Sequence, residues 1–338
     1  MTSRERTRRA LTFSNPDRPP RHLWMLPYVS LFRNEELAAL LEEYPCDIGS
    51  PAIQPPGEVD AEYQEHLRVL THTGSYTDSW GCVWEVGEPG VVGEVKHPPL
   101  ADWAALDTFQ PPWNVLMKRD LSHANRFCEA SDKFMMSSES ARPFERIQFL
   151  RGTENVFMDL ASDEPEIHKL IEMVHEYNLK DVSAWATSNV DGIFFMDDWG
   201  SNQALLIDPE MWRAIFKPLY RDYCRIIHDA GKFAFFHSDG NIASIYPDLI
   251  EVGVDAVNSQ LFCMDIEELG RRHKGKITFW GEIDRQRVLP FGTPEDVGNA
   301  VRRVRSALAD ESGGVIAQCE WGKDNLRENI EAVFEAWL

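Results

Sequence analysis

Five times in its second half, the 338-residue chain repeats a short apolar segment that ends in polar side chains and is followed by a helix-like segment. Buried parallel strands have this composition, and in a β/α barrel the loops after their carboxyl ends build the active site. The polar endings are Asp197-Asp198, His237-Ser238-Asp239-Gly240, Asn258-Ser259-Gln260, Glu282 and Cys319-Glu320. The repeat predicts an α/β enzyme built on a single (β/α)8 TIM-type barrel. A doubly wound sheet, the rival architecture, would gather its site at one switch point.

The remaining sequence is consistent with one domain spanning residues 1–338. Residues 22–26 form the first predicted strand. Residues 45–115, which are rich in Pro, Gly and Trp, predict a β-rich excursion after the first βα unit that covers the barrel mouth, with strands at 67–73, 76–78 and 82–86. The other predicted elements are helices at 4–11, 34–43, 114–129 and 165–180, a strand at 145–150, and helices at 209–230, 241–252, 265–273, 294–309 and 327–337.

The chain is strongly acidic, with a formal net charge of −21 at pH 7. Proteins that bind nucleic acid replace its counterions with Lys and Arg, so neither nucleic acid nor an anionic membrane is expected as a partner. No apolar signal-peptide core follows the first residues, and no segment reaches the roughly 18 apolar residues of a transmembrane helix. The six Cys residues form no CxxC pair, so we expect reduced thiols in a cytoplasmic protein.

His237 and Asp239 are two residues apart at one predicted strand end, where i and i+2 side chains point to the same side. Cys319 ends the last predicted strand, and distant strands meet at a barrel mouth. One imidazole, one carboxylate and one thiolate with an open fourth position match catalytic zinc. Singly, these residues could be a buried histidine, a helix N-cap and a small buried hydrophobe. Glu282 or Glu320 could complete the metal site in place of Asp239.

Other strand-end side chains are candidates for catalysis and substrate binding. We predict catalytic roles for Asp198 and Glu282, because carboxylates are costly to bury unpaired. Asp198 could act as a base or as a metal ligand, or it could cap a helix or form an ion pair, and Glu282 could instead pair with Arg285 or Arg287. The predicted substrate-binding residues are Trp24, Tyr28, Asp197, Trp199, Asn258, Gln260 and Trp280. The Trp side chains could wall an apolar or aromatic ligand, or they could pack in the core.

Several motifs resemble the uroporphyrinogen decarboxylase superfamily. They are Asp208-Pro209-Glu210-Met211-Trp212, His237-Ser238-Asp239-Gly240, residues 247–256, residues 289–297 and the closing Glu328-Asn329-Ile330. The resemblance covers most of the chain and implies a single β/α barrel. This superfamily contains metal-free decarboxylases and zinc-dependent methyltransferases that work with cobalamin.

The resemblance is closer to the methyltransferase branch. The decarboxylases carry an Arg-rich stretch after the first strand, whereas residues 24–28 contain no Arg and the next one is Arg33. The methyltransferases carry His-x-Cys at one strand end and a late Cys. Here His237 and Cys319 match, while Asp239 stands where the second ligand is usually Cys. This departure implies a more oxygen-rich zinc site that acts on oxygen or nitrogen methyl donors.

The leading hypothesis is a zinc-dependent methyltransferase that moves a methyl group between a small O-methyl or N-methyl substrate, including aromatic ones, and cobalamin on a corrinoid protein. The alternative is a metal-free decarboxylase of a porphyrinogen-like or small carboxylic acid. A third class is a non-catalytic scaffold protein with the same fold. The sequence leaves a homodimer open, and the fold does not identify the substrate.

Overall fold

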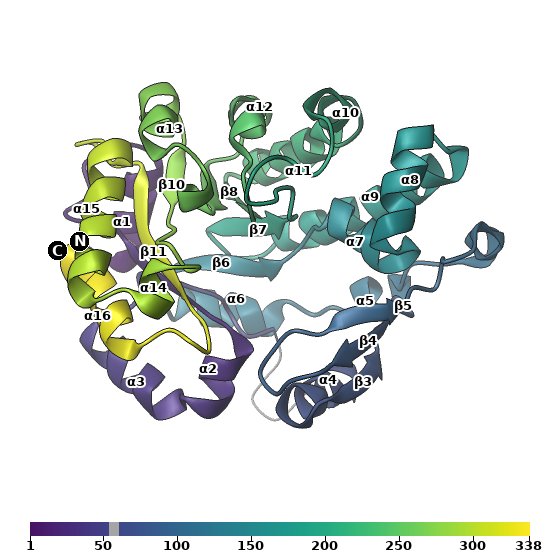
Figure 1. Cartoon of the computed structure of the whole chain (residues 1–338), viewed down its shortest axis with the longest axis horizontal. Helices are drawn as coiled ribbons and strands as arrows, with labels where there is room; N and C mark the ends of the chain where they lie inside the picture. The colour runs from purple at the N-terminus through teal and green to yellow at the C-terminus, as the bar shows by residue number, and fades with distance from the viewer. Residues whose placement is uncertain (54–60) are drawn as a thin grey trace.

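The computed structural model describes residues 1–53 and 61–338 and contains a barrel of eight parallel strands surrounded by helices (Figure 1). The barrel strands are β1 (Arg21–Met25), β2 (Ile48–Gly49), β6 (Phe134–Glu139), β7 (Gly192–Met196), β8 (Phe233–Ser238), β9 (Ala256–Ser259), β10 (Thr278–Trp280) and β11 (Val315–Trp321). Their order is β1-β11-β10-β9-β8-β7-β6-β2. The Asp47 N–H donates to the Arg21 carbonyl at 2.8 Å and links β2 to β1. The predicted (β/α)8 barrel is confirmed, and it is nearly closed.

Helices follow the strands in a regular alternation from β7 onward. The helices are α1 (Ser3–Leu11), α2 (Pro27–Phe32), α3 (Asn34–Glu43), α4 (Ala61–His72), α5 (Trp113–Met117), α6 (Ser122–Glu129), α7 (Pro143–Arg151), α8 (Thr153–Ser162), α9 (Pro165–Ala186), α10 (Pro209–Ile215), α11 (Lys217–Asp229), α12 (Tyr246–Val252), α13 (Ile266–His273), α14 (Val288–Phe291), α15 (Pro294–Leu308) and α16 (Arg327–Ala336). Local sequence sets their starts: α15 begins at a capping box between Thr293 and Asp296, with Pro294 at its first position. Of the helices in the described ranges, none is both long and apolar enough to cross a membrane.

The side chains of β11 alternate between the barrel interior and the surrounding helices, as the two-residue period of a strand requires. Ile316 packs inside with Phe235 and Trp280. Ala317 and Cys319, the residues on either side of Gln318, belong to the outer core beneath the helices. The alternation therefore assigns Gln318 and Glu320 to the inside and Cys319 to the outside.

The amino-terminal end of the barrel is covered by α1. The Gly314 N–H donates to the Ala10 carbonyl at 2.9 Å, and Leu11 packs with the interior side chains. The helix predicted at residues 4–11 therefore has a definite role, because it closes the end of the barrel opposite the polar mouth.

The predicted excursion contains a three-stranded antiparallel sheet with β3 (Gly74–Thr77), β4 (Val83–Val86) and β5 (Glu94–His97), together with α4 (Figure 1). Residues 54–60 of this segment lie outside the described ranges. The strand predicted at 67–73 is wrong, because these residues lie mostly in α4. The neighbours Val69 and Leu70 are both buried, as a helix allows, whereas a strand would turn them to opposite faces. That the excursion covers the mouth stays a prediction.

The strand predicted at 145–150 is also wrong, since these residues form α7. Phe144, Ile147 and Leu150 are buried at a spacing of three, which places them on one face of a helix. The strand of this part of the barrel is β6, Phe134–Glu139, which the sequence analysis did not predict.

Candidate functional site

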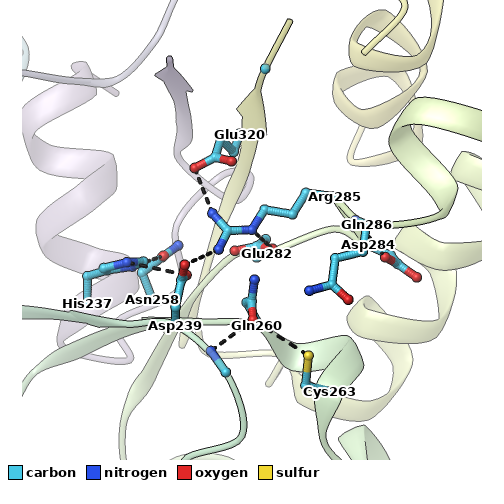
Figure 2. Close-up of polar contacts among 12 residues, drawn as sticks. His237, Asp239, Asn258, Gln260, Cys263, Glu282, Asp284, Arg285, Gln286 and Glu320 are labelled. Carbon is cyan, nitrogen blue, oxygen red and sulfur yellow. Dashed lines mark hydrogen bonds and ion pairs between the residues drawn. The ribbon is translucent and has the colours of Figure 1, made fainter. Parts of the chain in front are cut away.

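The polar strand ends converge at one mouth of the barrel. Asp198 follows β7, His237 and Asp239 lie at the end of β8, Glu282 follows β10, and Glu320 lies near the end of β11. The strands are parallel, so their carboxyl ends face the same side. Asp239, Glu282 and Glu320 point toward a central arginine (Figure 2).

Three of these side chains form a group that could hold a metal ion. The ligand atoms of Asp198, His237 and Asp239 lie within 4.8 Å of one another, and no other such group occurs in the part of the chain that the structure describes. His237 Nε2 is 3.5 Å from Asp198 Oδ1 and 3.5 Å from Asp239 Oδ1. Ligands about 2.1 Å from one zinc ion at a tetrahedral angle are about 3.4 Å apart, so these spacings suit a shared ion.

Asp239 provides a second sign of a bound cation. Its Oδ1 atom is buried and has no hydrogen-bond partner, which is uncommon for a buried carboxylate oxygen. The alternative role of Asp239 as a helix N-cap is not observed. The short 3-10 helix that follows begins at Ala243, and its N-cap residue is Ile242.

The orientation of His237 is fixed from behind by Asn258 of β9. Asn258 Nδ2 donates to the Trp280 carbonyl at 2.5 Å and to Gln318 Oε1 at 3.1 Å. Its Oδ1 atom therefore accepts from His237 Nδ1, at 2.6 Å. With the proton on Nδ1, Nε2 faces the two carboxylates, which is the arrangement that metal-binding histidines have.

The charges around His237 favour a cation between the two carboxylates. Burial lowers the pKa of His237, but the hydrogen bond to Asp198 and the charges of Asp239 and Asp198 outweigh it and raise the pKa to about 9. Burial raises the pKa of Asp198, yet hydrogen bonding and charge from His237 dominate and lower it to about 2. Either a proton on Nε2 or a metal ion supplies the positive charge that this site requires.

Arg285 links the remaining acidic side chains of the mouth. Its Nη2 pairs with Asp239 Oδ2, its Nε lies 3.4 Å from Glu282 Oε1, and its Nη1 lies 2.8 Å from Glu320 Oε2. Burial raises the pKa of Glu282 to about 8, partly opposed by Arg285. Sequence reasoning considered Arg285 only as a partner of Glu282 and missed its central place. Its pairing with Asp239 Oδ2 leaves Oδ1 directed toward His237.

Asp197 does not face the mouth, so its predicted role in substrate binding is corrected. Its carboxylate is fully buried and accepts from the N–H groups of Phe144 at 3.0 Å and Glu145 at 2.8 Å, and from the Tyr220 hydroxyl. Asp197 thus caps the amino terminus of α7. Glu145 on that helix accepts from the Asp198 N–H at 3.2 Å. Asp197 therefore acts on the site indirectly, by anchoring α7 beside Asp198.

Trp24 and Tyr28 lie near the mouth, on β1 and α2. The ring of Trp24 is half-buried, and its centroid is 4.7 Å from that of His237. Tyr28 is also partly exposed, with Lys323 Nζ 5.5 Å from its ring. Trp24 is therefore in position to contact a ligand bound beside His237.

Trp199 and Trp280 are fully buried, so they do not wall an open pocket as predicted. Trp199 stacks on Phe144 with ring centroids 3.9 Å apart, beneath the helices. Trp280 fills the barrel interior and donates from Nε1 to His22 Nδ1 at 3.0 Å. Of the predicted aromatic residues, mainly Trp24 is therefore in position to contact a ligand at the mouth.

Cys319 does not join the metal group, and this prediction is corrected. The strand continues past Cys319 to Trp321, so Cys319 points into the outer core, where it is fully buried. Burial and a neighbouring Cys46 raise the pKa of its thiol well above the usual value. The alternative of a small buried hydrophobe describes Cys319. Asp198, for which the sequence suggested a catalytic base or a ligand, takes the third place in the group.

A cavity of about 180 Å³ lies beside Arg285, and Asp198, His237 and Asp239 do not line it. Its wall includes Gln260 and Glu282, two residues predicted from their strand ends, and also Asn202 and Cys263, which sequence reasoning did not select. Gln260 Oε1 accepts from the Gly240 N–H at 2.8 Å, next to Asp239. A larger groove of about 560 Å³ lies between α5 and α9 and contains none of the predicted site residues.

Comparison with known proteins identifies the family. The sequence model of uroporphyrinogen decarboxylase (URO-D) matches residues 81–337, and the chain belongs to this family. No curated protein matches the sequence.

One solved structure shares the fold of this chain. A methyltransferase from Methanosarcina mazei matches with a TM-score of 0.71 and 13% identity, covering 100% of this chain and 98% of that chain. An endo-beta-1,4-xylanase from Gloeophyllum trabeum matches with a TM-score of 0.46 and 10% identity, covering 97% of this chain and 98% of that chain. At 13% identity the likeness to the methyltransferase is one of fold alone, and the likeness to the xylanase carries no argument.

Proposed function

We propose that this protein is a zinc-dependent methyltransferase that moves a methyl group from an O-methyl or N-methyl compound to a corrinoid carried by a separate protein. The observation that carries the proposal is the group of Asp198, His237 and Asp239, with two 3.5 Å spacings and a buried carboxylate oxygen that lacks a hydrogen-bond partner. Membership of the URO-D family and the structural likeness to the Methanosarcina mazei methyltransferase support the class.

Each residue of the mouth has a definite part in this proposal. Zinc, when bound, would polarise the leaving oxygen or nitrogen of the methyl donor, which is otherwise a poor leaving group. Asn258 holds the His237 ring so that Nε2 faces the ion, and Arg285 holds Asp239 so that Oδ1 does. Glu282 lines the cavity beside Arg285 and is proposed to exchange a proton with the leaving heteroatom.

The place of action is proposed to be the cytoplasm, because all six cysteines are free and five of them are buried in the core. Reduced thiols of this kind are typical of a reducing compartment. The corrinoid protein is likewise a proposed partner. We assign no surface of this chain to it or to a homodimer.

Metal-free decarboxylation is the second candidate, and Arg285 is the observation in its favour, because a substrate carboxylate needs a cationic partner. Arg285 is, however, already paired with Asp239, Glu282 and Glu320. Its guanidinium has little left to offer a substrate acid, so the methyltransferase is the better-supported function.

The test is methyl transfer to reduced cobalamin by the zinc-loaded protein, followed by the cobalt absorption change. The donors are a panel of methoxyarenes, methoxy alcohols and methylamines. We expect turnover with at least one class, and loss of turnover in His237→Ala. Release of CO₂ from a porphyrinogen or small carboxylic acid without metal, with no methyl transfer from any donor, would overturn the proposal.

A further inference from the structure

Behind His237, two buried carboxamides continue the hydrogen bonding of its ring. The first belongs to Asn258 on β9, whose Oδ1 accepts from His237 Nδ1 at 2.6 Å (Figure 2). The second belongs to Gln318 on β11, whose Oε1 accepts from Asn258 Nδ2 at 3.1 Å. All three side chains are buried, and Gln318 is only 1% exposed. They form one hydrogen-bonded chain that runs from the metal group into the barrel interior.

The backbone carbonyl of Trp280 fixes the direction of this chain. A carbonyl oxygen only accepts hydrogen bonds, so the Asn258 atom that lies 2.5 Å from it must be Nδ2. The other end of this amide is therefore Oδ1, which faces His237 Nδ1. The Gln318 atom that meets Nδ2 must in turn be the acceptor Oε1. Each bond of the chain thus has one possible direction.

Gln318 contributes a constraint that the Trp280 carbonyl alone does not. The two hydrogens of Asn258 Nδ2 point in different directions within the plane of the amide, and each has its own acceptor. One acceptor would let the amide turn about a single bond, whereas two acceptors define its plane. That plane sets the position of Oδ1, and Oδ1 orients the His237 ring.

The backbone beside Gln318 leaves room for its carboxamide. Gln318 and Asn258 lie on strands that are separated by β10, and Gly281 directly follows β10. Gly281 has a φ of +69°, which L side chains rarely adopt, and a Cβ atom there would overlap Gln318 Oε1 and lie 2.9 Å from Gln318 Cβ. The glycine therefore allows the two carboxamides to meet across β10.

The other end of Gln318 indicates that stability alone does not explain this residue. Its Nε2 atom is buried and has no hydrogen-bond partner in the described part of the chain. A buried donor without a partner destabilises a fold, and an unbranched apolar side chain such as methionine would avoid that loss. A residue that breaks such a rule and also completes the hydrogen bonding of a site is typical of a functional position.

Resting on the zinc site proposed above, we infer that Gln318 is a positioning residue, which acts through Asn258 to fix the plane of the His237 ring and direct Nε2 at the ion. Gln318 acts only indirectly, because its one side-chain hydrogen bond among the described residues is the bond with Asn258. Its effect is therefore on metal affinity and on the position of the imidazole.

The experiment measures the zinc affinity of wild type, Gln318→Met and Thr278→Val by competition with a chelator. Methionine removes the acceptor for Asn258 Nδ2, so we expect zinc to bind about tenfold more weakly, the lower end of the loss caused by removing an outer partner. Thr278→Val is the matched control, because it removes a buried hydroxyl without a partner from the neighbouring strand β10. We expect its zinc affinity to be unchanged.

A second measurement separates ring position from a general loss of structure. In metal-free protein with 15N-labelled histidine, we expect the proton on His237 Nδ1 to exchange with solvent about tenfold faster in Gln318→Met than in wild type or Thr278→Val. Gln318→Glu keeps an acceptor for Asn258 Nδ2 and should restore slow exchange. The Tm of metal-free Gln318→Met should lie within about 2 °C of that of the wild type.

Unchanged zinc affinity and proton exchange in folded Gln318→Met would overturn the inference, and so would an equal loss of affinity in Thr278→Val. If Gln318→Met does not fold, the wild type decides. Both side-chain amide protons of Asn258 should then exchange slowly, and fast exchange of either one would contradict two acceptors.

This test is separable from that of the proposed function. A wild type that binds no zinc would contradict the methyltransferase, whereas the exchange of the His237 Nδ1 proton in metal-free protein would still decide whether Gln318 orients the ring. Zinc binding with no effect of Gln318→Met on affinity or exchange would overturn the inference and leave the methyltransferase standing.

Discussion

Two ionic clusters lie at opposite ends of the barrel, and their charges are compensated very differently. At the amino-terminal end, Asp47 meets Arg6 at 2.6 Å and Arg18 at 2.7 Å, and Asp191 likewise meets two arginines of α1. Burial raises the pKa of Asp47, but hydrogen bonds from Arg18, Arg21 and Ser3 outweigh burial and lower it. Every carboxylate of this cluster is saturated by protein donors.

At the mouth, the carboxylates outnumber the arginines that pair with them. Arg285 pairs with Asp239, Glu282 and Glu320, and the buried Oδ1 of Asp239 has no hydrogen-bond partner, with His237 Nε2 3.5 Å away. We infer from this difference that protein side chains alone compensate the charges of the amino-terminal cluster, and that this cluster holds α1 in place. The mouth has more carboxylates than arginines, and the remaining positive charge must come from a proton on His237 or from a bound cation, which is what a cation-binding site requires.

The largest expected effect is on stability, from Asp47→Ala. This change removes the buried carboxylate that Arg6 and Arg18 share and leaves the buried Arg6 with Asp17 alone, so we expect the free energy of unfolding to fall by about 3 kcal/mol. Denaturant titration measures it. Zinc per folded chain should not change, and a loss of zinc in folded protein would contradict the separation of the two clusters.

The pH dependence of stability provides a sharper form of this prediction. The pKa of Asp47 is lower in the folded protein, so its ionised form stabilises the fold at pH values above about 4, its unfolded pKa. This contribution is lost as the pH falls through the folded pKa. The stability difference between wild type and Asp47→Asn should therefore shrink in acid, and a difference that grows in acid would be incompatible with the lowered pKa.

The next largest effect is expected at the mouth, from His237→Ala. Removing a ligand atom should weaken zinc binding by more than about 100-fold, because loss of an outer partner alone costs about 10–100-fold. Metal analysis and a competition titration with a chelator measure the affinity. Unchanged zinc affinity, in a variant that unfolds at the same temperature as the metal-free wild type, would show that the ion binds elsewhere.

A smaller effect is expected from Asn258→Leu, which removes the hydrogen bond that orients His237. We expect zinc affinity to fall by about 10–100-fold. The control is Ser259→Ala on the same strand, whose hydroxyl bonds with Tyr246 at 2.6 Å on the other face. If both variants weaken zinc binding equally, strand distortion rather than ring orientation is the cause.

The smallest effect at the mouth is expected from Cys319→Ala. The side chain lies in the outer core, so we expect a loss of about 1 kcal/mol of stability and no change in zinc affinity. Loss of zinc from this variant would restore Cys319 as a ligand and contradict the assignment of Asp198.

The barrel could be predicted because buried parallel strands give continuous apolar runs, and five of them end in polar residues. His237 and Asp239 could be paired because i and i+2 on one strand face the same way. Cys319 could not be placed correctly, since the side on which a strand residue points depends on register, and a shift of one residue reverses it. With Cys319 paired to Leu23, both side chains face outward.

The other misplaced residues depend on loop paths that no local pattern sets. Asp197 and Asp198 are adjacent, yet one caps α7 and the other joins His237, because α7 packs beside the end of β7. Arg285 reaches Asp239 only through the loop after β10. Spacing along the chain indicates which strand ends are polar but not how the loops between them fold.

X-ray absorption at the zinc edge tests most directly whether Asp198, His237 and Asp239 hold the ion. The expected result for the zinc-loaded protein is a first shell of nitrogen and oxygen at about 2.0–2.2 Å, with no sulfur neighbour. A sulfur shell at about 2.3 Å, or protein that retains no zinc after loading, would contradict a metal site built from these three residues.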